Sequence, residues 1–299
     1  MTTVAKQIAD LRRRFDAAGI EDARLNAELL LAHVLHVTRG TLLGMADHEL
    51  DAGQAARLAE LAARRERREP IDYILGERDF FGRTFAVRAG VLVPRPETEL
   101  IIEHAREVLP HGLRGLALDI GSGSGALAVT LACEFAGLRV VATDISAAPV
   151  RTARENATRH GVADRVHVLR CDGVSAVIER PEFALIVANP PYVDRADLAE
   201  MQPEVRDFEP HEALFAEQQG AALVKAWLPQ MRQRLAPGGL CMLEFGAGQG
   251  ERTLQFAREA GFNEVKLLRD YAGLERTLGP RASGAWVAAA PRRREFAEP

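Results

Sequence analysis

The chain has 299 residues, 47% hydrophobic and 27% charged; this balance is typical of folded globular proteins and argues against disorder, and the length predicts about two domains. Its formal net charge of −4 argues against a protein whose main task is to hold nucleic acid. The three cysteines lack C-x-x-C spacing, so no zinc site or disulfide framework is predicted; without an apolar leader or a membrane-length run we expect a cytoplasmic protein.

The first part of the chain has a helical pattern. From Val4 to about Arg68, apolar residues recur every three or four positions, and proline and glycine are nearly absent. We therefore expect residues 1–78 to form a small helical bundle. It carries no recognisable catalytic group, so partner recognition is its expected role. The charged run Arg64–Arg68 ends the last helix, and a solvated face is the favoured interpretation over a phosphate-binding patch.

Residues 79–95 are expected to form a β-hairpin that connects two domains, because short apolar runs flank Gly82. A helix then begins near Pro96, where acidic residues suit the positive end of the helix dipole. Just before it lies Arg95. Its guanidinium has two expected partners: a carboxylate of a ligand, or a structural ion pair with Glu97 or Glu99. We expect the second domain to span residues 96–299.

From Leu116 onward, predicted strands alternate with predicted helices. Seven apolar runs have strand character: Leu116–Ile120, Val140–Asp144, Val166–Asp172, Phe183–Ala188, Leu240–Phe245, Val265–Leu268 and Ala285–Ala289. Alternation of this kind indicates the α/β class, and we predict a seven-stranded, doubly wound, Rossmann-like sheet.

A glycine-rich loop follows the first of these strands and opens a helix. Its sequence, Gly121-Ser122-Gly123-Ser124-Gly125, allows the backbone to approach a ligand closely, and Asp144 ends the next strand, where it can accept both hydroxyls of a ribose. Taken alone, the loop also satisfies a dinucleotide fingerprint. Asp119 before the loop and Asp172 after the third strand favour a different nucleoside ligand, because a nicotinamide site requires neither.

The second motif, Asn189-Pro190-Pro191-Tyr192, follows the apolar run Phe183–Ala188. A buried parallel strand that ends in two prolines places this tetrapeptide at the carboxyl edge of the sheet, where ligands bind in open α/β folds. Asn189 offers an amide, Pro190 a carbonyl oxygen and Tyr192 a flat ring. Together they predict a clamp for a planar nitrogen of an amide or a base.

These motifs together resemble the class I S-adenosylmethionine-dependent methyltransferases that act on amino or amide nitrogen. Further segments extend the resemblance over nearly the full length to the peptide chain release factor glutamine N5-methyltransferases: the helical N-terminal part, Gly90–Glu99, Phe208-Glu209-Pro210 and Asp270-Tyr271-Ala272-Gly273. A sister group that methylates a glutamine of a large-subunit ribosomal protein shares the tetrapeptide. Its proline-arginine segment usually differs, so residues 94–99 favour the release factor group.

The resemblance implies an enzyme that transfers a methyl group from S-adenosylmethionine to the Gly-Gly-Gln glutamine of class 1 release factors, releasing S-adenosylhomocysteine without a metal. It implies that Asn189 and Pro190 accept the two amide protons and that Tyr192 packs on the amide plane. The cofactor residues it implies are Asp119, Gly121, Ser122, Gly123, Ser124, Gly125, Asp144, Asp172, Gly173 and Asn189. The substrate residues it implies are Asn189, Pro190, Pro191, Tyr192, Arg95 and Glu97.

Two departures from the family pattern stand out. Residues Ala216–Gly220 replace the usual Gly-Gly-x-Asp-Gly, which concerns loop contacts to the substrate. Gly173 replaces the aromatic residue often found after the third-strand acid, and we expect looser packing on the adenine there.

The alternatives are glutamine methylation of the ribosomal protein, N6-adenine methylation of nucleic acid, a nicotinamide oxidoreductase, and a non-catalytic nucleoside sensor. We expect a monomer with no direct contact to nucleic acid or membrane.

Overall fold

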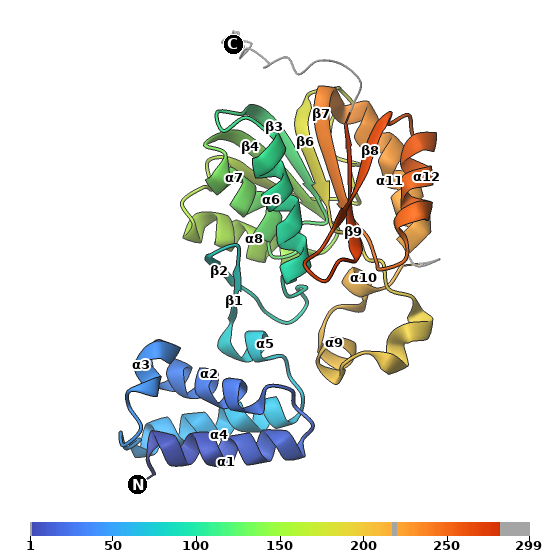
Figure 1. The fold of residues 1–299 in the computed structure, drawn as a ribbon. Coiled ribbons are helices and arrows are strands. Elements are labelled where there is room, and N and C mark those ends of the chain that lie inside the picture. Colours follow the sequence, from blue (N-terminus) through green and yellow to red (C-terminus); the bar gives the residue numbers. More distant parts are fainter. Residues whose placement is uncertain (1, 217–219, 282–299) are drawn as a thin grey trace. The chain divides into compact units, whose positions relative to one another are not determined.

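A computed structural model describes residues 2–216 and 220–281 (Figure 1). The chain forms two compact units. One consists of Met1–Glu77 with Met201–Phe208, and the other of Arg78–Glu200 with Glu209–Pro299. The chain thus leaves the second unit once, for a short segment that folds with the first.

The first unit is helical. Its helices are α1 (Val4–Ala17), α2 (Ala23–Leu35), α3 (Arg39–Leu43), α4 (Ala52–Glu66), α5 (Ile71–Leu75) and, from the later segment, α9 (Pro203–Phe208). Buried Leu11, Phe15, Leu30 and Leu61 belong to its single apolar core, as their helical spacing predicts. Asp51 and Gln54 form a reciprocal capping box that fixes the start of α4.

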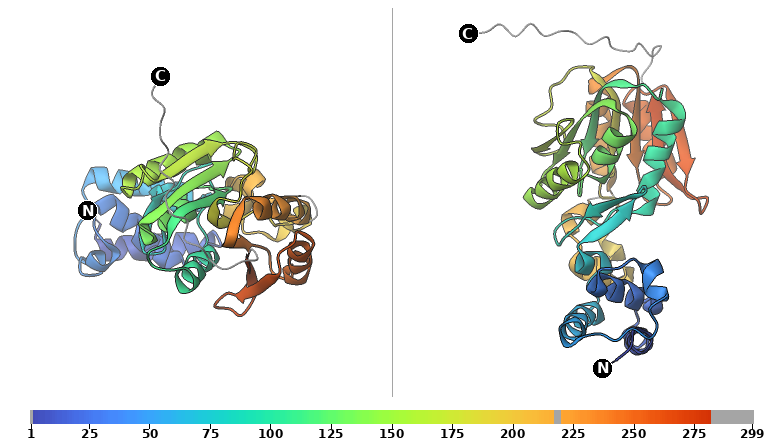
Figure 2. Two further views of the ribbon diagram at one scale, coloured as in Figure 1. Left: turned by 90° about the horizontal axis from the view of Figure 1, so that it is seen from above. Right: turned by 90° about the vertical axis from the view of Figure 1, so that its left-hand side faces the viewer.

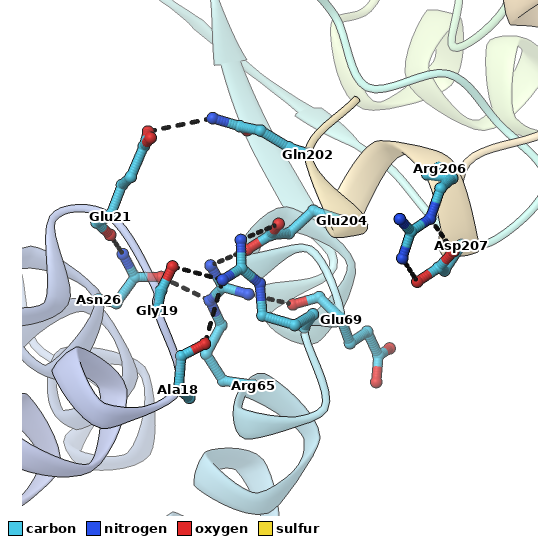
Figure 3. A network of polar contacts seen from close by, with 11 residues as sticks. Ala18, Gly19, Glu21, Asn26, Arg65, Glu69, Gln202, Glu204, Arg206 and Asp207 are labelled. Atoms are coloured by element: carbon cyan, nitrogen blue, oxygen red, sulfur yellow. Dashed lines mark hydrogen bonds and ion pairs between the residues drawn. The ribbon is translucent and has the colours of Figure 1, made fainter. Parts of the chain in front are cut away.

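Helix α9 is held in this unit by ion pairs (Figure 3). Glu204 accepts hydrogen bonds from Arg65 at 2.7 Å and from Arg68 at 2.6 Å, and the Arg65 side chain is only 6% exposed. The expectation of a solvated face is therefore wrong for these two arginines. Gln202 adds a hydrogen bond to Glu21. The sequence analysis missed this role of the segment, because the partners are more than 130 residues apart.

The second unit is built on a seven-stranded sheet with the order β5-β4-β3-β6-β7-β9-β8. A separate hairpin, β1 (Glu77–Phe80) and β2 (Arg83–Ala86), precedes it, as expected about Gly82. The strands of the sheet are β3 (Arg114–Ile120), β4 (Gly137–Asp144), β5 (Val166–Arg170), β6 (Phe183–Ala188), β7 (Leu235–Glu244), β8 (Glu264–Arg269) and β9 (Glu275–Arg281). Strands β3 to β7 pair in parallel, whereas β9 is antiparallel to both of its neighbours.

The predicted class and the seven-stranded, doubly wound sheet are confirmed, with one difference in the last strand. We predicted a strand at Ala285–Ala289, which lies outside the described residues. The seventh described strand is instead β9. Its sequence contains Gly279 and Pro280 and little apolar character, so it gives no strand pattern, yet it pairs between β7 and β8.

Helices cover both faces of the sheet (Figure 2). One face packs on α6 (Glu99–Val108), α7 (Ala126–Glu134) and α8 (Ala147–Arg159), and the other on α11 (Ala221–Arg234) and α12 (Gly250–Glu259). The shorter helices of this unit are η1 (Pro96–Thr98), η2 (Arg195–Glu200) and α10 (His211–Leu214). Because successive side chains of a strand face opposite sides, Leu185 and Val187 of β6 enter one core and Ile186 and Ala188 the other.

All six residues of β6 are buried, which agrees with a continuous apolar strand in the middle of a parallel sheet. Within residues 2–216 and 220–281, no helix is long and apolar enough to cross a membrane.

Candidate active site

The carboxyl ends of five adjacent strands carry a row of polar groups. In the order of the sheet they are Asp172 after β5, Asp144 on β4, the loop Gly121–Gly125 after β3, Asn189 after β6 and Glu244 on β7. Strands β3 and β6 are neighbours at which the winding of the chain reverses. In open α/β sheets this position is where ligands bind.

A cavity of about 570 Å³ lies at this edge, within the size range of small-molecule sites. Seven predicted site residues line it: Gly121, Gly123, Asp144, Asp172, Gly173, Asn189 and Pro191. The remaining predicted site residues do not line the cavity; they are Asp119, Ser122, Ser124, Gly125, Pro190, Tyr192, Arg95 and Glu97. The structure therefore brings the two motifs together around one space.

Asp144 is fixed by backbone hydrogen bonds. Its Oδ2 accepts from the N–H of Gly123 at 3.0 Å, and its Oδ1 accepts from the N–H of Ser146 at 2.9 Å. Burial raises the pKa of Asp144, and these two hydrogen bonds oppose that rise. Each carboxylate oxygen keeps a further lone pair, so the group can still accept the hydroxyls of a ribose.

Asp119 precedes the loop, and its side chain is hydrogen-bonded to α7, the helix that follows the loop. Its side chain is buried, and Oδ2 accepts from the N–H of Ala128 in the first turn of α7 at 3.1 Å. Its other oxygen, Oδ1, has no hydrogen-bond partner among the described residues. Burial raises the pKa of Asp119 to about 7, and the nearby Asp144 adds to that rise.

The glycines of the loop have different surroundings. Gly121 and Gly123 line the cavity, whereas Gly125 packs against α8. A Cβ on Gly125 would lie 2.9 Å from the Cβ of Ala153, so only glycine lets α7 begin this close to α8. Ser122 and Ser124 are buried in the same turn.

Trp227 of α11 is a site residue that the sequence analysis missed. It lines the cavity and is 9% exposed. A Cβ on Gly173 would lie 3.1 Å from Nε1 of Trp227, so the indole lies directly against this glycine. An aromatic side chain from another element thus lies beside Gly173, where the family pattern usually has its own aromatic residue. The only available sequence signal was a lone tryptophan on a predicted helix.

The tetrapeptide is anchored from behind. Asn189 donates from Nδ2 to Oγ1 of Thr98 at 3.0 Å, and the Tyr192 hydroxyl donates to Oε1 of Glu244 at 3.1 Å. The Tyr192 carbonyl accepts from Nε2 of Gln249 at 3.1 Å. Burial and the carboxylate of Glu244 raise the pKa of Tyr192, so its phenol keeps its proton.

Thr98 and Glu244 were also missed as site residues. Thr98 lies inside the proline-arginine segment, and Glu244 is an acid at the end of an apolar strand. Those were the only signals available: the segment 94–99 was used for the family resemblance without a role for Thr98, and Glu244 belongs to no motif used above.

Arg95 has a structural partner, but a different one from those expected. Its Nη2 donates to Oε1 of Glu209 at 2.7 Å, and the Glu209 side chain is 2% exposed. The backbone N–H of Val93 donates to the other oxygen of Glu209. Glu99 accepts the N–H of Phe81, and Glu97 is exposed. Arg95 therefore ties the segment before η1 to the start of the segment that leads to α10.

The segment 210–216 forms one wall of the cavity. Ser146 donates from Oγ to Oε1 of Glu212 at 2.5 Å, which joins this wall to the loop after β4. Within the departure Ala216–Gly220, residues 217–219 lie outside the described residues; Ala216 lines the cavity.

Comparison with known proteins identifies relatives of both parts of the chain. Residues 7–76 match the PrmC N-terminal domain, and residues 96–204 match the methyltransferase small domain. The release factor glutamine methyltransferase of Nitratidesulfovibrio vulgaris is 39% identical, covering 90% of this chain and 92% of the relative. That of Koribacter versatilis is 38% identical, covering 89% and 94%.

A 16S rRNA methyltransferase from T. thermophilus, solved in complex with AdoMet and guanosine, shares the fold. It is 22% identical, with a TM-score of 0.51, and the match covers 69% of this chain and 49% of that one. At this identity the likeness concerns the fold alone. The identity and coverage of the bacterial relatives are far higher, and they show that this chain belongs to the release factor glutamine methyltransferase family.

Proposed function

We propose that this protein transfers a methyl group from S-adenosylmethionine to the side-chain amide nitrogen, N5, of the glutamine in the Gly-Gly-Gln tripeptide of class 1 release factors. The observation that carries the proposal is the position of Asn189 and Pro191 in the wall of the cavity that also holds Asp144 and Asp172. The group proposed to bind the amide and the groups proposed to bind the nucleoside thus line one cavity, in a chain of the family named above.

The residues around the cavity suit this methyl donor. The loop glycines leave room for backbone contact, Asp144 suits the two ribose hydroxyls, and Asp172 suits the adenine. Trp227 offers an aromatic face beside Gly173. When bound, S-adenosylmethionine supplies an electrophilic methyl group on a sulfonium sulfur.

A primary amide nitrogen is a poor nucleophile, because its lone pair is delocalised into the carbonyl group. The residues of the tetrapeptide therefore act by positioning. In the proposed role, Oδ1 of Asn189 and the carbonyl oxygen of Pro190 accept the two amide protons, and the ring of Tyr192 packs on the amide plane. Fixing such a geometry contributes up to ~7–11 kcal/mol in favourable cases.

No general base is required before the attack. The amide nitrogen would become acidic as its bond to the methyl carbon forms and the sulfur–carbon bond of the donor breaks. One of its two protons would then pass to water, while Asn189 and Pro190 hold the nitrogen in place. This mechanism requires no catalytic histidine near the tetrapeptide.

The helical unit is proposed to bind the release factor. It has its own core and no predicted catalytic group, and it includes α9, which begins at Pro203 in the chain segment after Tyr192 of the tetrapeptide. We also propose that the enzyme acts in the cytoplasm as a monomer without direct contact to nucleic acid. Sedimentation analysis of the purified chain checks the monomer.

The test is transfer of labelled methyl from S-adenosylmethionine to a class 1 release factor. Its glutamine-to-alanine Gly-Gly-Gln variant, a large-subunit ribosomal protein and duplex DNA serve as parallel acceptors. We expect label on the intact factor and none on the variant. Label only on the ribosomal protein or only on DNA would reassign the substrate. No label on any acceptor would favour a sensor that binds without reacting.

A further inference from the structure

Two buried polar side chains, those of Thr98 and Glu244, are hydrogen-bonded to residues of the tetrapeptide. Thr98, at the end of η1, is 6% exposed, and Glu244, at the end of β7, is 0% exposed. They connect to Asn189 in a chain of hydrogen bonds. Nδ2 of Asn189 lies 3.0 Å from Oγ1 of Thr98, which lies 2.6 Å from Oε2 of Glu244. The second carboxylate oxygen accepts from Tyr192 at 3.1 Å.

The number of protons available to these hydrogen bonds determines which group donates and which accepts in each of them. An ionised carboxylate only accepts hydrogen bonds, so the single hydroxyl proton of Thr98 must be donated to Glu244. The 2.6 Å separation agrees with such a charge-assisted bond. The Thr98 oxygen can then only accept from Asn189. Asn189 must therefore turn its NH₂ group toward Thr98.

This orientation decides what Asn189 offers to a ligand. Asn189 lines the cavity, and with Nδ2 committed to Thr98 its free group is the acceptor Oδ1. If the Asn189 amide were rotated by 180°, its NH₂ group would face the N–H of a substrate amide, and two donors repel each other. Only one of the two orientations is compatible with binding a glutamine nitrogen.

We propose that Thr98 and Glu244 are positioning residues for Asn189: together they hold its side-chain amide with Oδ1 toward the nitrogen to be methylated. The inference rests on the proposed function and deepens it by assigning the orientation of the group that receives the amide proton. Neither residue touches the substrate in this role.

The charge of Glu244 controls which groups donate in the hydrogen bonds that link it to Thr98 and Asn189. Burial raises its pKa to about 7, while the hydrogen bonds from Thr98 and Tyr192 oppose the rise. Of the charged groups around it, Glu97 of η1 raises the pKa and Arg276 of β9 lowers it.

Arg276 is itself paired with Asp270 at 3.2 Å, so its charge is partly offset. A protonated Glu244 can donate to Thr98. The Thr98 proton is then free to turn toward Asn189, which permits the wrong amide orientation.

The variants separate this role from a merely structural one. Thr98→Val keeps the shape and removes the hydroxyl, whereas Thr98→Ser keeps the hydroxyl. We expect Thr98→Val to lower kcat roughly tenfold, as for loss of one hydrogen bond, with unchanged affinity for S-adenosylmethionine, and Thr98→Ser to restore most of it. Thr130→Val is the matched control, since Thr130 is fully buried on α7 and its hydroxyl has no partner among the described residues.

Glu244→Gln tests the direction of the chain. A glutamine can accept from Thr98 through its oxygen and contact Tyr192 through its NH₂ group at every pH. In the wild type, kcat/KM should fall as the pH drops through about 7, where Glu244 becomes protonated. In Glu244→Gln this acid limb should be reduced to the contribution of Asp119, whose pKa is also raised to about 7 and which the substitution leaves in place.

The decisive experiment is a double-mutant cycle measured as kcat for methyl transfer to the release factor. If Thr98 acts through Asn189, Thr98→Val should lower kcat in the wild type and have no further effect in Asn189→Ala. Wild-type kcat in Thr98→Val, equal losses in Thr98→Val and Thr98→Ser, or additive losses in the cycle would each overturn the positioning role. An acid limb in Glu244→Gln as large as that of the wild type would overturn the control of the amide orientation by the charge of Glu244.

A wrong proposed function would give a different experimental result from a wrong positioning role. It would appear as a wild-type enzyme that leaves the release factor unlabelled, and it would overturn both proposals together. A labelled factor with unaffected Thr98→Val would overturn the positioning role alone.

Discussion

Gly220 packs against the backbone of the tetrapeptide, and we expect Gly220→Ala to impair catalysis. The residue has a φ of +75°, and a Cβ there would lie 2.5 Å from the carbonyl oxygen of Pro191 and 3.0 Å from Cα of Tyr192. Apart from its own residue and the two chain neighbours, a Cβ atom in a protein essentially never lies closer than 3.0 Å to another heavy atom. The backbone of Pro191 or of Gly220 must therefore move by about 0.5 Å.

The size of the effect follows from this displacement. A misplacement of ~1 Å at a reacting centre can cost ~10²-fold in rate, so a shift of half that size should lower kcat roughly tenfold. The left-handed backbone adds ~1–2 kcal/mol of strain for any residue with a Cβ. For a unit of this size that strain lowers Tm by about 2–8 °C.

Gly161→Ala is the matched control. Gly161 has a φ of +68°, and a Cβ there would meet no atom within 4 Å, so the variant carries the backbone strain without the clash. The assay compares kcat for methyl transfer at saturating S-adenosylmethionine with Tm from calorimetry for both variants. If both lose the same Tm and Gly220→Ala keeps the kcat of Gly161→Ala, the Gly220 contact does not hold the tetrapeptide in place.

Substitutions at three further residues test other parts of the structure. Asn189→Ala should lower kcat/KM for the release factor by roughly 10²-fold at saturating S-adenosylmethionine, and near-wild-type turnover would contradict its role. Trp227→Ala should weaken S-adenosylmethionine binding at least about fivefold, since stacking on a base is worth ~1–3 kcal/mol, and Trp227→Phe should weaken it less. Equal affinities would exclude stacking of the indole on the adenine. Glu204→Gln should lower the free energy of unfolding by about 3 kcal/mol in urea titrations, because Arg65 and Arg68 lose their buried counter-charge. Burial raises the pKa of Glu204, but the hydrogen bonds from both arginines have the larger combined effect and lower the pKa below 4.5. The difference in unfolding free energy between wild type and Glu204→Gln should therefore shrink as the pH falls below 4.5. A difference that stays constant with pH would contradict the ion pairs.

The sequence alone determined the parts of the fold that depend on local pattern. The apolar run Phe183–Ala188 predicted a buried parallel strand, and all six residues are buried in β6. Parallel strands bring their carboxyl ends to one edge, so the motifs that follow β3 and β6 were expected at the same edge of the sheet, and the pairing of β3 with β6 makes them neighbours there. The cavity at that edge accordingly contains Gly121, Asp144 and Asn189.

Only the tertiary structure decided the partners of the charged and polar side chains. Arg95 pairs with Glu209, 114 residues away, and Thr98 with Glu244, 146 residues away, whereas the sequence suggested neighbours of Arg95 at two and four positions. Periodicity reports which face of an element is apolar, but an ion pair depends on which buried charges meet once the elements have packed.

The same limit explains the other differences. Strand β9 has no strand pattern and exists because β7 and β8 supply hydrogen-bonding edges on both sides. Trp227 faces Gly173 because α11 packs over that end of the sheet. Short-range chemistry in the chain determined where the site would form, and long-range packing determined which side chains complete it, because a buried polar group is stable only where the fold brings it a partner.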